Sequence, residues 1–236
     1  MGAWGRIAWW KRWVLIGVAI LLVAVVGGPF AYIHLIEGKG PGPLTLASPS
    51  SDSSGSSGLS SATAPDGTWK VATGSVVGYR VNEVLFGQSN VAVGRTGAIT
   101  GSITVRGTTI TAGTITVDMT TVTSDQSRRD EQFNGRIMET ATYPTATLVL
   151  SDPVTLGSTP AVGAERSVQV TGTLTLHGVT KTVTFSVAGR YQGATFSVAG
   201  SIPITFSDWN IQSPSVGPVT TEDHGTLEFS LVFARA

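Results

Sequence analysis

The strongest constraint on the fold is a pair of adjoining stretches, residues 168–176 and 179–187, in which apolar and polar side chains alternate. Successive side chains of an extended strand point to opposite faces, so each stretch would carry one apolar face and one face of threonine and serine. The apolar faces consist of Val168, Val170, Leu174 and Leu176 in the first stretch and Val183, Phe185 and Val187 in the second. His177 and Gly178 separate the stretches, and the pattern predicts a β-hairpin with one dry side.

The same alternation recurs along residues 67–236. Further candidate strands with one apolar face lie at 77–81, 99–105, 115–119, 146–150, 196–206 and 227–233. Antiparallel sheets that are wet on one side give this pattern, and short turns between regular strands favour a barrel or a sandwich. We therefore expect one all-β domain over 67–236, with about eight antiparallel strands.

One segment of this domain departs from the β pattern. Ser124 and Asp125 can begin a helix, helix-forming residues follow, and Asn134-Gly135 can end it in a left-handed turn. We expect a short helix that caps one end of the barrel.

The amino-terminal region has a different character. Residues 13–36 contain no Asp, Glu, Lys or Arg, and about 20 apolar residues are enough for a helix to cross a bilayer. Arg6, Lys11 and Arg12 precede the stretch and mark its cytoplasmic side. The sequence predicts a cytoplasmic segment 1–12, a transmembrane helix 13–36 and an extracytoplasmic remainder. A cleaved signal peptide is the alternative, although the long apolar stretch favours a retained anchor.

Residues 37–66 are rich in glycine, serine and proline and contain little that could be buried. Such segments do not recover the entropy of ordering, so a flexible linker with a reach of roughly 30 Å is expected here.

Composition removes several function classes. The chain has no cysteine, which rules out disulfides, thiolate metal sites and a lipoprotein anchor. Its 15 basic and 15 acidic residues form no basic stripe, so a nucleic-acid partner is not expected. No nucleophile elbow, phosphate-binding glycine loop or spaced carboxylate pair is present. We expect no catalytic residues and no cofactor.

The histidines of the domain do not indicate a metal site. His177 lies at the predicted hairpin turn and is expected to face solvent. His224 directly follows Glu222 and Asp223, and three consecutive side chains do not easily converge on one ion.

Three segments, in this order, resemble the YceI-like family of lipocalin-like, lipid-binding barrels. The first runs from Thr123-Ser124-Asp125 through Arg128-Arg129-Asp130 to Tyr143-Pro144, and the second is Gly172-Thr173-Leu174-Thr175-Leu176-His177-Gly178-Val179-Thr180-Lys181. The third extends from Phe206 to Phe229, with Trp209-Asn210 where an aromatic residue and glycine are more usual in the family. The resemblance implies an extended eight-stranded antiparallel barrel that holds an isoprenoid or similar lipid tail.

An eight-stranded barrel is either filled by its own side chains or just wide enough for one small ligand. The candidates for lining a cavity are Val81, Ile103, Ile115, Val117, Leu148, Leu174, Leu176, Phe185 and Phe196. The alternative is that these side chains pack against one another as a solid core. Arg129 could bind a lipid headgroup through its guanidinium. The favoured alternative is an ion pair that pins the helix to the barrel, because Asp130 would compete with an anionic ligand.

Two functions follow. The first is a membrane-anchored extracytoplasmic protein that sequesters or carries an isoprenoid or quinone-type lipid. The second is a non-enzymatic envelope interaction or structural module with a solid barrel. Barrels of this kind can also pair through strand edges, which allows a homodimer.

Overall fold

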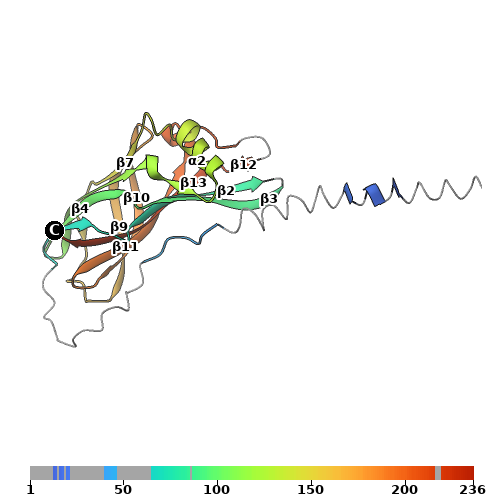
Figure 1. The fold of residues 1–236 in the computed structure, drawn as a ribbon. Coiled ribbons are helices and arrows are strands. Elements are labelled where there is room, and N and C mark those ends of the chain that lie inside the picture. The colour runs from blue at the N-terminus through green and yellow to red at the C-terminus, as the bar shows by residue number, and fades with distance from the viewer. Residues whose placement is uncertain are drawn as a thin grey trace, which may run out of the picture.

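The computed structural model describes residues 13–14, 16–18, 20–21, 40–46, 65–85, 87–215 and 219–236. Eight antiparallel strands form a closed ring, in which β13 pairs with β11 on one side and returns to β1 on the other. In ring order these strands are β1 (Gly67–Val71), β4 (Ile99–Arg106), β5 (Thr109–Asp118), β7 (Thr145–Leu150), β9 (Glu165–Leu176), β10 (Val179–Tyr191), β11 (Thr195–Thr205) and β13 (His224–Arg235). The predicted all-β, eight-stranded antiparallel barrel is confirmed (Figure 1).

The two ends of the barrel differ because β13 changes its neighbour along its length. Its last residues pair with β1, whereas Thr226–Ser230 pair with β2 (Val76–Leu85). Strand β3 (Gln88–Thr96) extends the sheet beyond β2. Three short strands pair at the margins: β6 (Thr123–Ser124) with β3, β8 (Val154–Thr155) with β5, and β12 (Val219–Thr221) with β2.

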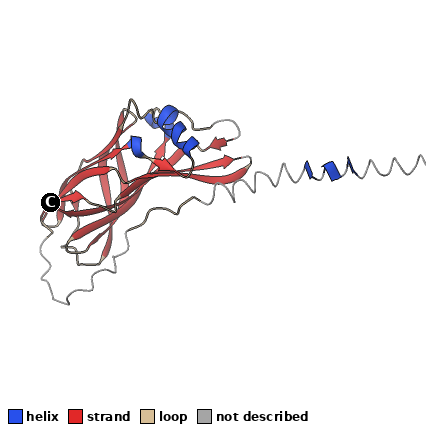
Figure 2. Cartoon of the chain, viewed as in Figure 1, coloured by secondary structure: helices blue, strands red, loops and turns tan. Residues whose placement is uncertain are grey.

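The connection between β5 and β7 carries helical turns at the end of the barrel away from the carboxyl terminus (Figure 2). These are η2 (Met119–Thr121), α2 (Ser127–Gln132) and the π-helical turn η3 (Phe133–Ile137). The helix does not end at Asn134-Gly135 as predicted, since η3 continues to Ile137 and the left-handed residue is Glu139, with φ 44°. The burial of Phe133 and Met138 explains the extension, because both side chains anchor the continued turn in the core.

The carboxyl-terminal end of the barrel is filled by aromatic side chains. The Trp69 ring lies edge-on to Phe196, with 4.7 Å between ring centroids, and Tyr191 packs on Phe196 at the same separation. Trp69 is fully buried, and its Nε1 donates a hydrogen bond of 2.8 Å to the Pro65 carbonyl. Edge-to-face pairs add about 0.5–1.5 kcal/mol beyond their buried area. We call Trp69, Tyr191 and Phe196 the aromatic plug.

The sequence pattern missed β1 and β3. In β3 the inward residues are small: Ala92 and Thr96 face the barrel interior, while Val93 lies on the opposite face of the strand. An inward face of alanine, glycine and threonine does not have the apolar alternation by which the other strands were identified.

The predicted transmembrane helix falls largely outside the described residues. The described positions between 13 and 21 are helical, and their apolar side chains are exposed. Within the described part of the chain, no helix has the length and apolar character needed to cross a membrane.

Only residues 40–46 and 65–66 of the segment expected to be a flexible linker are described. Residues 40–46 lie against the outer face of the barrel and form hydrogen bonds with it, so this part of the segment is held in place.

Candidate functional site

The barrel encloses a cavity of about 760 Å³ between the aromatic plug and the helical turns. Small-molecule sites typically measure about 300–1,000 Å³. Strands β2, β5, β7, β9, β11 and β13 supply most of its apolar wall, and Phe133, Ile137 and Met138 cover it from the helical side. The exposed side chain of Arg128 is among the lining residues, so the cavity reaches the surface beside α2. We call this opening, lined by Glu83, Leu85 and Arg128, the mouth.

Six of the nine predicted lining residues face this cavity: Val81, Ile115, Val117, Leu148, Leu174 and Leu176. Their common wall follows from strand register, because Leu148 pairs with Ile115 on one side and with Leu174 on the other. Side chains on paired positions of neighbouring strands lie next to one another on the same face of a sheet.

The other three, Ile103, Phe185 and Phe196, are not among the cavity-lining side chains. Phe185 and Phe196 are buried in the core, and Ile103 is partly buried against it. Phe196 belongs to the aromatic plug, and Ile103 is the register partner of Trp69 at that end. Phe185 packs against Phe229, with 5.9 Å between ring centroids. Alternation predicts the face of a strand on which a side chain lies, but not its depth along the barrel.

Sequence reasoning did not select Tyr79 or Phe133, whose rings are stacked in the cavity wall with 5.1 Å between centroids. The Tyr79 ring lies so close to Gly94 that a Cβ at this position would overlap it. Burial raises the pKa of the Tyr79 phenol above its ordinary value of 10.0, so the group stays neutral at physiological pH. The available sequence signal for this part of the cavity wall was the presence of two aromatic residues, Tyr79 and Phe133, and of a glycine, Gly94, that leaves room for the Tyr79 ring.

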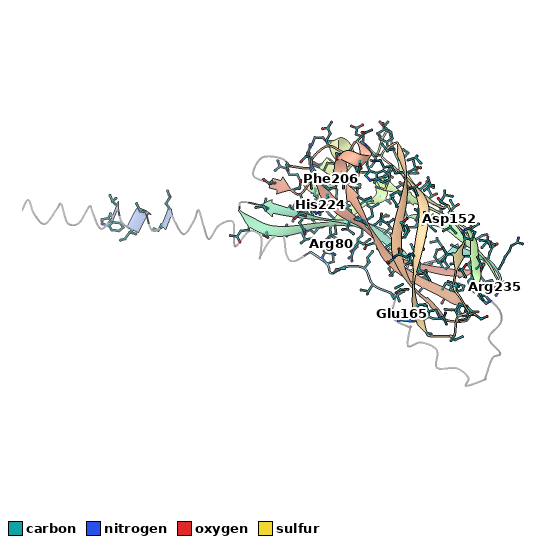
Figure 3. All side chains as sticks on the ribbon, turned by 180° about the vertical axis from the view of Figure 1, so that it is seen from behind. Arg80, Asp152, Glu165, Phe206, His224 and Arg235 are labelled. Carbon is teal, nitrogen blue, oxygen red and sulfur yellow. The ribbon has the colours of Figure 1, made fainter. Side chains whose placement is uncertain are left out.

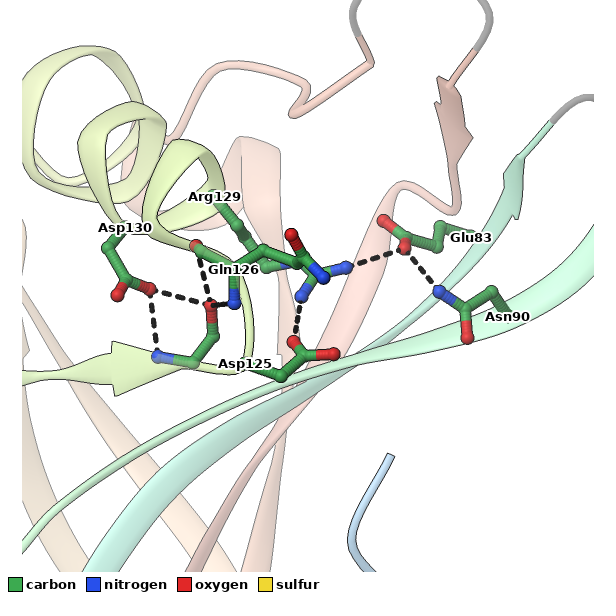
Figure 4. A network of polar contacts seen from close by, with 7 residues as sticks. Glu83, Asn90, Asp125, Gln126, Arg129 and Asp130 are labelled. Atoms are coloured by element: carbon green, nitrogen blue, oxygen red, sulfur yellow. Dashed lines mark hydrogen bonds and ion pairs between the residues drawn. The ribbon is translucent and has the colours of Figure 1, made fainter. Parts of the chain in front are cut away.

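Arg129 connects α2 to β2 at the mouth (Figure 4). Its Nη2 lies 3.1 Å from Glu83 Oε1, and its Nη1 contacts Asp125. Asn90 Nδ2 also donates to Glu83 Oε1, at 2.9 Å. Two carboxylates thus surround the guanidinium, which is the geometry of an ion pair that pins the helix to the barrel.

The two residues next to Arg129 in sequence have different roles. Asp130 accepts hydrogen bonds from the Ser124 amide at 2.8 Å and from the Ser124 hydroxyl at 2.6 Å, which fixes the start of the helical segment. The exposed Arg128 guanidinium has no hydrogen bond or ion pair with any described residue.

The predicted solvent-facing position of His177 is wrong. His177 and Gly178 both have positive φ, at 48° and 74°, as the two central residues of a type I′ hairpin turn do. His177 is 8 % exposed, and its ring centroid lies 4.7 Å from that of Tyr143. Its Nδ1 donates to the Trp209 carbonyl at 3.1 Å. It therefore ties the hairpin to η4 (Phe206–Trp209) and does not contribute to the cavity lining.

His224 stays at the surface. Its Nδ1 lies 2.8 Å from Asp223 Oδ1 and its Nε2 lies 3.3 Å from Glu222 Oε2. The hydrogen bond to Asp223 raises the pKa of His224. Among the described side chains, no group of three or more histidines and acids is arranged to hold a metal ion.

Comparison with known proteins places this geometry in a family context. The model of the YceI-like domain matches residues 69–233. A polyisoprenoid binding domain from Saccharophagus degradans, implicated in plant cell wall breakdown, superposes with a TM-score of 0.57 at 19% identity. The match covers 72% of this chain and 98% of that one.

The structure of Burkholderia cenocepacia BcnA superposes with a TM-score of 0.51 at 24% identity, over 65% of this chain and 95% of that one. At such identities these likenesses show the fold. None of the curated proteins matches the chain at a significant level.

Proposed function

The chain belongs to the YceI-like domain family, and we propose that it binds the tail of an isoprenoid or quinone-type lipid in its barrel. The observation that supports this most strongly is the apolar cavity of about 760 Å³, which the aromatic plug closes at one end and which opens beside α2. An alkyl tail is held by burial of apolar area, worth about 0.8 kcal/mol per CH₂ group. Binding of this kind requires no catalytic group.

The competing function, an interaction module with a solid barrel, is less well supported. A solid barrel would require the interior side chains to meet one another along its whole length. The interior meets this requirement at the aromatic plug but leaves a cavity between Leu174, Leu148 and the helical side.

We place the lipid headgroup at the mouth. Arg129 is already held by Glu83 and Asp125, so it acts in this proposal as a positioning residue for α2. Arg128 is the cation that remains available there for an anionic headgroup.

We also propose that the protein is membrane-anchored, with the barrel outside the cytoplasm. This rests on the apolar stretch 13–36 and on the basic residues that precede it. A homodimer would form through the free edge of β3. Among the described strands, β2 pairs with one edge of β3, and the other edge is paired, with β6, only at Gly94 and Arg95.

A pair of variants on neighbouring residues of β9 tests lipid binding. Leu174→Trp places a large ring in the cavity, whereas Thr175→Trp places the same ring on the outer face of the same strand. We expect lipid extracted from the purified protein to fall sharply for Leu174→Trp and to stay at the parent level for Thr175→Trp. Equal lipid content in the two variants would overturn the proposal.

A further inference from the structure

Residues 40–46, which we call the strap, are bound to the outside of the barrel through their backbone. Arg80 Nη2 donates a hydrogen bond of 2.7 Å to the Pro41 carbonyl, and Arg95 Nη2 donates to the Gly42 carbonyl. In the opposite sense, the Leu44 amide donates to Glu228 Oε2 at 3.2 Å. Donors and acceptors of the barrel thus match those of the strap backbone. The strap runs alongside the barrel in Figure 1.

The barrel residues that hold the strap form a charged cluster of their own. Glu228 lies between Arg95, at 3.0 Å, and Arg80, at 3.4 Å, and it is only 3 % exposed. A buried carboxylate is tolerated when cationic partners and further hydrogen bonds satisfy its oxygens. The Leu44 amide supplies one of these hydrogen bonds, so the strap is part of what makes the cluster favourable.

The strap also covers an apolar side chain. Val93 lies on the outer face of β3 but is only 5 % exposed. A Cβ on Gly40 would lie 3.5 Å from Val93 Cγ2 and 2.8 Å from the Val91 carbonyl oxygen, so the strap backbone packs directly on this strand. Two independent observations, the hydrogen bonds and the covered valine, indicate that the strap belongs to the folded domain.

The strap runs from the mouth toward the aromatic plug. Its first residue, Gly40, lies beside Val91 and Val93 of β3, and the residue between these two, Ala92, lines the cavity. Four residues later, Leu44 contacts Glu228 of β13. Along β13, residues near His224 lie at the mouth side and Arg235 lies at the plug. Figure 3 shows Arg80 and His224 toward one end of the barrel, with Arg235 at the other. Gly40 is therefore at the mouth end.

Only three residues, Glu37 to Lys39, separate Gly40 from the apolar stretch that ends at Ile36. An extended chain spans at most about 3.3–3.6 Å per residue, so Ile36 and Gly40 are no more than about 14 Å apart. If residues 13–36 are embedded in a membrane, this short connection keeps Gly40, and with it the mouth end of the barrel, close to the membrane surface. The plug end then lies farther from the membrane.

We propose that the strap orients the barrel with its mouth facing the membrane, so that a lipid passes between bilayer and cavity without crossing bulk water. This inference rests on the proposed anchoring and lipid binding. The partner of the mouth end is the bilayer surface. Val84, which is 42 % exposed on β2 near the mouth, suits the apolar boundary of the bilayer, and the available Arg128 suits a headgroup phosphate.

The absence of cysteine from the chain allows a direct test with single labels. Ser89→Cys places a fluorophore at the exposed start of β3 on the mouth side, and Ala194→Cys places it in the exposed turn between β10 and β11 next to the plug. The full chain is reconstituted into phosphatidylcholine–phosphatidylglycerol vesicles that contain a headgroup-nitroxide lipid. We expect several-fold stronger quenching at position 89 than at position 194.

A variant that releases the strap identifies the cause of this difference. Replacing Arg80, Arg95 and Glu228 by alanine removes the side chains that hold the strap backbone, and this should bring the quenching at the two positions close together. Replacing Glu165 and Arg190 by alanine breaks an ion pair away from the strap and should leave the difference intact. Equal quenching in the parent, or an unchanged difference in the triple variant, would overturn the proposal. Thermal unfolding checks that the barrel remains folded.

Lipid extraction and fluorophore quenching test lipid binding and orientation separately. A chain that carries extracted lipid but shows equal quenching contradicts the orientation and leaves lipid binding standing. A parent chain without lipid contradicts lipid binding. A chain that does not associate with vesicles contradicts both the anchoring and the orientation.

Discussion

Arg128 and Arg129 are neighbours in sequence with opposite environments. Arg129 is 16 % exposed and contacts Glu83, which is 8 % exposed, whereas Arg128 is exposed at the mouth. The sequence predicted an ion pair that pins the helix as the favoured role of Arg129, and the geometry agrees. It did not identify Glu83 as the partner, because a residue 46 positions away becomes a neighbour only when β2 and α2 pack together.

This contrast gives a matched pair of substitutions. Arg129→Met leaves the Glu83 carboxylate without its cation, which should lower the free energy of unfolding by about 1–3 kcal/mol. Arg128→Met removes a group without a partner and should leave stability close to that of the parent. Chemical denaturation of both variants measures the difference, and equal losses would contradict the assigned roles.

Tyr79 gives a prediction about alkaline pH. Burial raises the pKa of its phenol above 10.0, so the unfolded chain ionises at this position before the folded chain does. The corresponding stability is fully present below about pH 10 and is lost as the pH rises further. Stability measured against pH should therefore decline less steeply above pH 10 in Tyr79→Phe than in the parent. Identical slopes would show that Tyr79 does not contribute.

Strands whose apolar and polar residues alternate could be predicted from the sequence. The hairpin of β9 and β10 was predicted with its turn at His177-Gly178, since both strands carry apolar residues on one face. Strand β3 was not, because Val93 faces outward beneath the strap and the inward residues are small. The burial of the His177 side chain could not be predicted, because it depends on the backbone angles of the turn, which composition does not reveal. Asn210, at φ 54°, occupies a left-handed position where the family more usually has glycine, and asparagine tolerates this conformation.

The strap should be visible to hydrogen exchange. The Leu44 amide donates to a buried carboxylate, whereas the Thr45 amide has no hydrogen bond with a described residue. We expect Leu44 to exchange much more slowly than Thr45, and Glu228→Ala to remove this protection. Equal rates at the two amides in the parent would mean that the strap is not bound in solution.

At the scale of the whole molecule, the protein is a barrel with one filled end and one hollow end. The repeated alternation predicted about eight antiparallel strands in a barrel or a sandwich, and the family resemblance implied the closed barrel. Most of the predicted lining residues do face the cavity. The division into plug and cavity could not be predicted, since it depends on where along the barrel Trp69, Tyr191 and Phe196 meet. These residues come from three strands: β10 and β11 pair directly, whereas β1 reaches β11 only through β13, so the contact depends on the register across all of these strands.

Native mass spectrometry of the mildly purified protein shows whether the hollow end of the barrel holds a lipid tail. We expect the protein to carry an added mass that matches one isoprenoid or quinone-type lipid and that is released on unfolding. A parent protein that appears only at its polypeptide mass, combined with a large drop in melting temperature for Leu174→Trp, would contradict lipid binding and indicate a packed interior.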